Sequence, residues 1–237
     1  AIGTTVTAAP GYPELAVKNL AELTGIDFKN SEDLIAATSD CGAYMTLSSA
    51  IKGLAVKMTK VCNDIRLLAS GPRCGLKEIN LPQLQPGSSI MPGKVNPVAA
   101  EVANQASFLA IGLDTTVMLA ASAGQLELNV MEPVITFALY TQMKVMTNAC
   151  DTMRTKLVEG VTANTERCKD YVMNSIGIVT LLKPHFGYQK CAAIAKEGYT
   201  TGKSLHQIVV DEQHLMTQAE WDATFNTQNL IHPKFVK

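Results

Sequence analysis

LSSAIKGLAVKMTKVCNDIRLL (residues 47–68) has the clearest periodicity in the chain. Its apolar residues recur at alternating spacings of four and three, at Leu47, Ile51, Leu54, Met58, Val61, Ile65 and Leu68. This spacing places them along one seam of an α-helix, which must pack against other helices along its length. The Gly71-Pro72 pair that follows predicts where this helix ends.

Two more long helices are expected after it, over residues 97–121 and 129–158, and Gly124 separates them. Gln142 interrupts the apolar seam of the second. The expected seam residues are Val102, Ala106, Leu109, Leu113, Thr116 and Ala120 in the first helix, and Val134, Ala138, Leu139, Met146, Ala149, Met153 and Leu157 in the second. Seams this long usually face more helices than one chain supplies, which favours a bundle shared between subunits.

Shorter helices are expected on both sides of this region. Residues 13–23 should form one that stops at Gly25, and the acidic run after Ser31 is typical of a helix start. After Gly160 the expected helices cover residues 164–174, 188–197, 204–210 and 217–225, and the last begins with a Thr217–Glu220 capping box. No alternating strand pattern is present. The prediction is an all-α protein, with a long-helix bundle in residues 1–160 and a small helical C-terminal domain in residues 161–237.

The composition limits the class of protein. The chain is 47% hydrophobic and 17% charged with a net charge of −1, which indicates a globular protein and excludes a disordered one. The sequence contains no basic patch that would predict binding to nucleic acid. We also expect no apolar run long enough to span a bilayer. The six cysteines contain no CxxC pair, so we expect reduced thiols, no zinc site and a cytoplasmic location. A catalytic cysteine is a weaker alternative, because no partner histidine can be identified from the sequence.

Residues 87–97, GSSIMPGKVNP, predict a loop that leads into a helix and carries the chemistry. Gly87 and Gly93 give backbone freedom at both ends. Pro92 prevents a regular helix between them, and Pro97 suits the first turn of the next one. The polar side chains of the loop are Ser88, Ser89, Lys94 and Asn96, and Met91 is expected to pack under it.

The string matches every fixed position of GSSxMPxKxNP, the signature of the fumarase/aspartase superfamily, which the chain therefore resembles. The segments GPRCGLKEINLP, AGQLELNVMEPV, NSIGIVT and QNLIHP are similar to matching stretches of aspartate ammonia-lyases. Class II fumarases share the loop and much of the bundle. Met131-Glu132-Pro133 and the TGKS of residues 201–204 favour the aspartase branch.

The resemblance implies the reversible deamination of L-aspartate to fumarate and ammonia, without a cofactor or metal. It implies that Ser88 is the general base, acting as an oxyanion, and that Ser89 donates to the β-carboxylate. Lys94 and Asn96 would bind the α-carboxylate, and donors placed where charge develops would supply most of the rate. Glu101 would orient a histidine of another subunit, although a glutamate there is equally explained by the helix N-terminus.

Members of this superfamily are about twice as long, and the chain resembles only their C-terminal half. The Thr-His pair of the family is absent, and none of the four histidines is assigned to catalysis. The resemblance implies a homotetramer with active sites shared between three subunits, so the isolated chain should be inactive. Class II fumarase, and a non-catalytic scaffold or binding protein that kept the lyase fold, remain alternatives.

Overall fold

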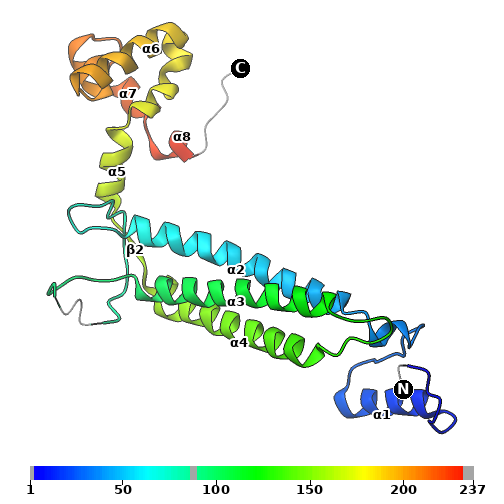
Figure 1. Cartoon of the computed structure of the whole chain (residues 1–237). Helices are drawn as coiled ribbons and strands as arrows, with labels where there is room; N and C mark the ends of the chain where they lie inside the picture. The colour runs from blue at the N-terminus through cyan, green and yellow to red at the C-terminus, as the bar shows by residue number, and fades with distance from the viewer. Residues whose placement is uncertain (1–2, 86–89, 232–237) are drawn as a thin grey trace. The chain divides into compact units, whose positions relative to one another are not determined.

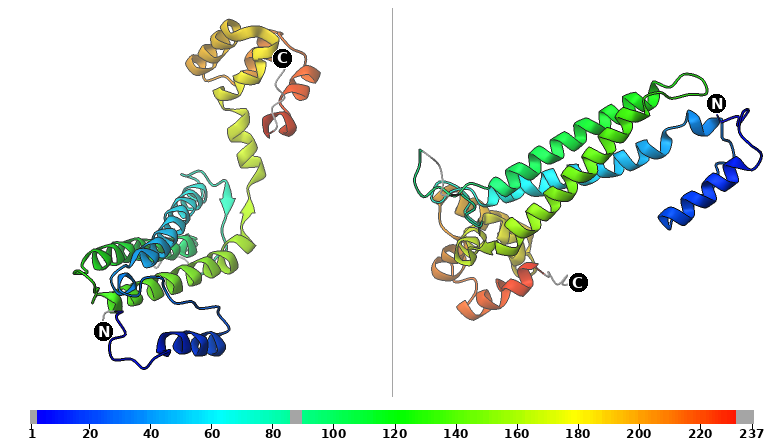
Figure 2. Two further views of the ribbon diagram at one scale, coloured as in Figure 1. Left: turned by 90° about the vertical axis from the view of Figure 1, so that its right-hand side faces the viewer. Right: turned by 90° about the horizontal axis from the view of Figure 1, so that it is seen from below.

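The computed structural model describes residues 3–85 and 90–231, which fall into two compact units whose boundary in the sequence lies between Thr162 and Ala163. Three long helices form the first unit: α2 (Gly42–Leu68), α3 (Val98–Ser122) and α4 (Glu132–Lys156). These helices run side by side, and α3 packs against both α2 and α4 (Figures 1 and 2). The predicted all-α fold with long bundle helices is confirmed.

The remaining elements of the first unit are short. Helix α1 (Tyr12–Thr24) ends, as expected, at Gly25, whose φ of 72° is a left-handed conformation that suits glycine. The helix start predicted after Ser31 is wrong. Asp33 Oδ1 instead accepts hydrogen bonds from the N–H groups of Ile35 and Ala36, at 2.9 and 3.0 Å, and closes a turn before the 3-10 helix η1 (Ala36–Thr38).

Two very short strands, β1 (Ile79–Asn80) and β2 (Thr162–Ala163), pair with one another. Strands of two residues are too short to give an alternating pattern, so the sequence did not predict them. The 3-10 helix η2 (Val158–Gly160) precedes β2. Gly160 is required here, because a Cβ at this position would lie 2.7 Å from the Pro82 ring.

The buried line of the bundle differs from the predicted seams of α2 and α3. Leu54 and Leu109 are 46% and 49% exposed in the single chain. The residues between the helices are mostly small: Ser48, Ala55 and Cys62 on α2, and Ala99, Ala100, Ala103, Asn104, Ser107, Ala110, Asp114, Val117 and Ala120 on α3. Small side chains let the helices approach closely. The larger apolar residues of the predicted seams therefore lie partly outside the contact between the helices.

The predicted seam of α4 is largely correct, because Ala138, Met146 and Met153 are buried. Gln142 does not interrupt this face but belongs to it. Its side chain is fully buried, and its Nε2 donates to the carbonyl oxygen of Ala110 at 2.9 Å.

Helix α3 is, within the described part of the chain, long and apolar enough by length and composition to cross a membrane. The expectation that no segment meets this measure is therefore corrected. Its packing against α2 and α4, and the Asp114 carboxylate near its middle, are those of a bundle helix. Alanine-rich composition, suited to close helix packing, explains its high apolarity.

The second unit contains α5 (Thr165–Met173), the 3-10 helix η3 (Ile176–Leu182), α6 (Lys183–Thr201), the π-helix η4 (Gln207–Glu212), α7 (Gln218–Thr224) and α8 (Thr227–Ile231). Its core is centred on Trp221, which stacks on Phe225 with the ring centroids 3.9 Å apart. The predicted capping box is confirmed, because Thr217 and Glu220 exchange hydrogen bonds at the start of α7.

Candidate active site

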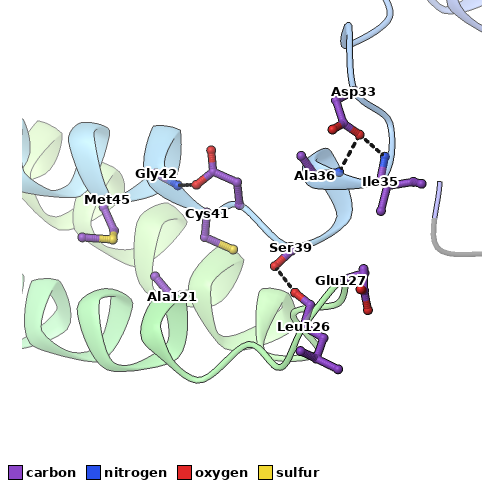
Figure 3. Close-up of a pocket in the computed structure, with 11 residues that line it drawn as sticks. Asp33, Ile35, Ala36, Ser39, Cys41, Gly42, Met45, Ala121, Leu126 and Glu127 are labelled. Carbon is purple, nitrogen blue, oxygen red and sulfur yellow. Dashed lines mark hydrogen bonds between the residues drawn. The ribbon is translucent and has the colours of Figure 1, made fainter.

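A first cavity, of about 670 Å³, lies where α2 begins and α3 ends (Figure 3). Ser39 Oγ donates to the carbonyl oxygen of Leu126 at 2.8 Å and ties the two ends together. The charged residues lining this cavity are Asp33, Asp40 and Glu127, with no basic side chain among them. A carboxylate ligand would be repelled here.

The acidic side chains of this first cavity have structural partners. Asp33 accepts from two backbone N–H groups, and Asp40 accepts from the N–H of Gly42 at 2.8 Å. Burial, together with the negative charges of Glu132 and Asp40, raises the pKa of the Cys41 thiol above its ordinary value. Cys41 therefore stays protonated, which disfavours a nucleophilic role.

A second cavity, of about 610 Å³, has the opposite charge. It lies at the C-terminal end of α2 and the N-terminal end of α3, beside the segment that carries the predicted site. The residues that line it are Arg66, Ala69, Ser70, Gly71, Pro72, Lys77, Asn80, Leu81, Gln83, Gly93, Lys94, Val95, Asn96, Pro97 and Glu101. Three of these side chains are cationic and one is anionic, so this cavity suits a ligand with more than one carboxylate.

The wall that follows α2 is a loop that folds back on the end of the helix. Ser70 organises it. Its Oγ donates to the carbonyl oxygen of Leu67 at 2.6 Å and accepts from the N–H of Leu76 at 3.1 Å, while its own carbonyl oxygen accepts from the N–H of Lys77 at 2.8 Å. Gly75 permits this close return, because a Cβ there would lie 2.5 Å from the Ser70 carbonyl carbon. The fold of this loop brings Lys77 to the cavity.

The segment before α3 and the first turn of α3 bring together four of the predicted site residues, Gly93, Lys94, Asn96 and Glu101. Gly93 has a φ of 80°, so the backbone freedom expected of this glycine is used. Pro97 precedes the first residue of α3, and its carbonyl oxygen accepts from the N–H of Glu101 at 3.0 Å. Glu101 is half-buried in the first turn of α3, and its side chain faces the cavity.

The other predicted site residues are placed differently. Gly87, Ser88 and Ser89 lie outside the described residues. Met91, which is expected to pack under the loop, has a side chain that is 52% exposed. Lys94 is exposed, and within residues 3–85 and 90–231 neither it nor Glu101 forms an ion pair. Both charges are therefore available to a ligand.

Arg66 and Lys77 also line this cavity, and no sequence motif predicted them as site residues. Arg66 falls in the helix predicted over residues 47–68, and Lys77 falls in GPRCGLKEINLP (residues 71–82), whose resemblance to aspartate ammonia-lyases assigns it no role. Three cations within twelve residues, Arg66, Arg73 and Lys77, do not by themselves indicate a site. The presence of Arg66 and Lys77 at one cavity depends on the return of the chain after Gly71, and the sequence does not specify that return.

Two family models match the chain: a lyase model over residues 1–112 and a fumarase C C-terminus model over residues 178–232. The chain is 56% identical, over 99% of its length, to the aspartate ammonia-lyase of Escherichia coli (strain K12). It is 51% identical over its full length to the aspartate ammonia-lyase of Helicobacter pylori (strain ATCC 700392 / 26695). This chain belongs to the fumarase/aspartase superfamily.

Solved structures agree with membership of the fumarase/aspartase superfamily. A fumarate lyase:delta crystallin from Brucella melitensis bound to cobalt is 41% identical with a TM-score of 0.89, over 94% of this chain and 48% of that chain. A class II fumarase from Schistosoma mansoni is 32% identical with a TM-score of 0.89, over 98% of this chain and 52% of that chain. The chain spans about half the length of the curated relatives it matches.

Proposed function

We propose that this chain is the C-terminal half of a carbon–nitrogen lyase that reversibly deaminates L-aspartate to fumarate and ammonia. The observation that supports this most strongly is the cavity that gathers Lys94, Asn96 and Glu101 among cationic residues. Both L-aspartate and fumarate carry two carboxylates, which such a cavity can bind. The identity of 56% to an aspartate ammonia-lyase favours this substrate over other dicarboxylates.

In the proposed reaction Ser88 removes the proton from the carbon next to the β-carboxylate, while Ser89 donates to that carboxylate. Lys94 and Asn96 bind the α-carboxylate and hold the substrate in one orientation. An ordinary serine hydroxyl is a weak base, so its surroundings must stabilise the oxyanion. N–H groups of the glycine-containing turn and the Lys94 ammonium are the groups that could do so. Glu101 orients a histidine supplied by another subunit.

We infer that residues 1–160 are the C-terminal part of the central helical-bundle domain and that residues 161–237 are a small C-terminal domain. The assembly is a cytoplasmic homotetramer whose active sites each take residues from three subunits. Apolar side chains left exposed on the long helices support such an assembly, including Leu54 on α2, Leu109 on α3 and Phe137 on α4. The 237-residue chain alone is therefore inactive.

Class II fumarase is the competing function, since one such enzyme is 32% identical. Purified full-length protein should be offered L-aspartate and L-malate in turn, and fumarate formation followed by its ultraviolet absorbance. Turnover of L-aspartate alone supports the proposal, whereas turnover of L-malate alone contradicts it. Sedimentation velocity on the same sample tests the tetramer, and fumarate formation by the 237-residue chain would contradict its inactivity.

A further inference from the structure

Arg66 is the one arginine among the described residues that line the second cavity, and none of the family features used above assigns it a role. It lies in the last turn of α2, exposed toward the cavity that Lys94 and Asn96 also line. No ion pair to Arg66 occurs in the described part of the chain. Its guanidinium therefore has unused donors beside the proposed substrate site.

Two asparagines support the position of Arg66. Its Nη1 lies 3.5 Å from Asn63 Oδ1, and the same Oδ1 accepts from Asn104 Nδ2 on α3 at 2.8 Å. Asn104 is only 3% exposed, and its own Oδ1 has no hydrogen-bond partner among the described residues. Asn63 therefore connects Arg66 to a buried side chain of α3.

The spacing of these residues links the supporting pair to the cavity. Asn63 and Arg66 are three residues apart on α2, as are Glu101 and Asn104 on α3, so each pair shares one helix face. Arg66 and Glu101 line the cavity, while the Asn63–Asn104 hydrogen bond joins the two helices behind them. This cross-link fixes the α2 wall, from which Arg66 extends, relative to the α3 wall.

We propose that Arg66 binds one carboxylate of the dicarboxylate substrate while the Lys94–Asn96 pair binds the other, and that Asn63 and Asn104 position Arg66. This inference rests on the proposed function. A guanidinium presents two parallel N–H donors to a carboxylate, which a lysine cannot do. Separate cationic groups for the two carboxylates make the site selective for dicarboxylates over monocarboxylates.

The test measures inhibition of the full-length enzyme by succinate, a dicarboxylate, and by propanoate, a monocarboxylate. For Arg66→Gln we expect the succinate inhibition constant and the KM for L-aspartate to rise by about 10- to 100-fold. The propanoate constant should change by less than about threefold, because the Lys94–Asn96 end remains. Arg66→Lys should be intermediate for succinate. Asn63→Ala should shift the succinate constant in the same direction by about threefold.

Arg73→Gln is the matched control, because Arg73 is an exposed arginine in the same region that does not line the cavity, and it should leave all constants unchanged. An unchanged succinate constant in Arg66→Gln overturns the proposal. An equal rise for succinate and propanoate also overturns it, since that indicates general damage to the cavity. If the wild type does not turn over L-aspartate, the proposed function fails. Calorimetric titration of wild type and Arg66→Lys with succinate still tests Arg66.

Discussion

Lys52 on α2 and Asp114 on α3 form an ion pair inside the three-helix bundle. The Asp114 side chain is 10% exposed and also accepts a hydrogen bond from Ser48 at 2.8 Å, whereas the Lys52 side chain is 41% exposed. Ser48 and Asp114 both lie on the line of mostly small buried residues that separates the helices. The pair therefore fixes the register of α2 on α3.

Removal of the Lys52 ammonium should leave the buried Asp114 carboxylate without the positive charge that offsets its desolvation. For Lys52→Met we expect a loss of about 1 to 3 kcal/mol in the free energy of unfolding, less than for a fully buried pair because Lys52 is partly solvated. Chemical denaturation followed by circular dichroism measures this. Lys57→Met, on the same helix and without an ion pair among the described residues, is the control. Equal effects in the two variants would remove the special role of Lys52.

The ion pair also predicts how stability depends on pH. Burial alone would raise the pKa of Asp114, but the hydrogen bonds from Lys52 and Ser48 and the charge of Lys52 outweigh it, so the pKa lies below the ordinary value of 3.8. The unfolded state therefore binds a proton at Asp114 more readily than the folded state does. The contribution of Asp114 to the free energy of unfolding is complete above that value and is lost as the pH falls below it. The stability difference between wild type and Asp114→Asn should therefore shrink on acidification below about pH 4. A difference that does not change with pH contradicts this.

The stacked pair Trp221 and Phe225 predicts a local effect in the second unit. Trp221 is the only tryptophan of the chain, so its fluorescence reports this unit alone. Phe225→Ala should cost about 3 to 5 kcal/mol, because it removes a buried ring and its stacking on Trp221. Tyr199→Ala, whose side chain is 82% exposed on α6, should cost far less. A fluorescence transition that shifts equally in both variants would count against the assigned core.

The Lys94 ammonium is expected to act in binding rather than in proton transfer. In the full-length enzyme, Lys94→Ala should raise the KM for L-aspartate by about 10- to 100-fold, with a smaller change in kcat, because a charge-assisted contact to a carboxylate is lost. Steady-state kinetics with L-aspartate provide the measurement. An unchanged KM would show that Lys94 does not bind the substrate.

Much of the fold could be predicted from the sequence, because glycine and proline mark the ends of α1, α2 and α3 and the apolar spacing is long. The buried face of each helix could not be predicted. Hydrophobicity predicts that Leu54 and Leu109 are buried, whereas close helix packing buries Ala55 and Ala110 instead. Which apolar residues are covered depends on how closely neighbouring helices approach, and periodicity within one helix does not contain that information.

The candidate site was predicted in part for a similar reason. Lys94, Asn96 and Glu101 are close in sequence, so their joint presence at one cavity follows from a local motif. Arg66 reaches the same cavity from another helix, through a contact between Asn63 and Asn104 that are 41 residues apart. Such a contact exists only once the helices have packed.

Proton abstraction by Ser88 is the central claim, and turnover of L-aspartate by Ser88→Ala in the full-length enzyme tests it most directly. We predict that kcat falls by about 100-fold or more, as expected when a general base is removed. The inhibition constant for succinate should stay within about twofold of the wild type, because the carboxylate contacts remain. Near-normal turnover by Ser88→Ala would contradict the claim.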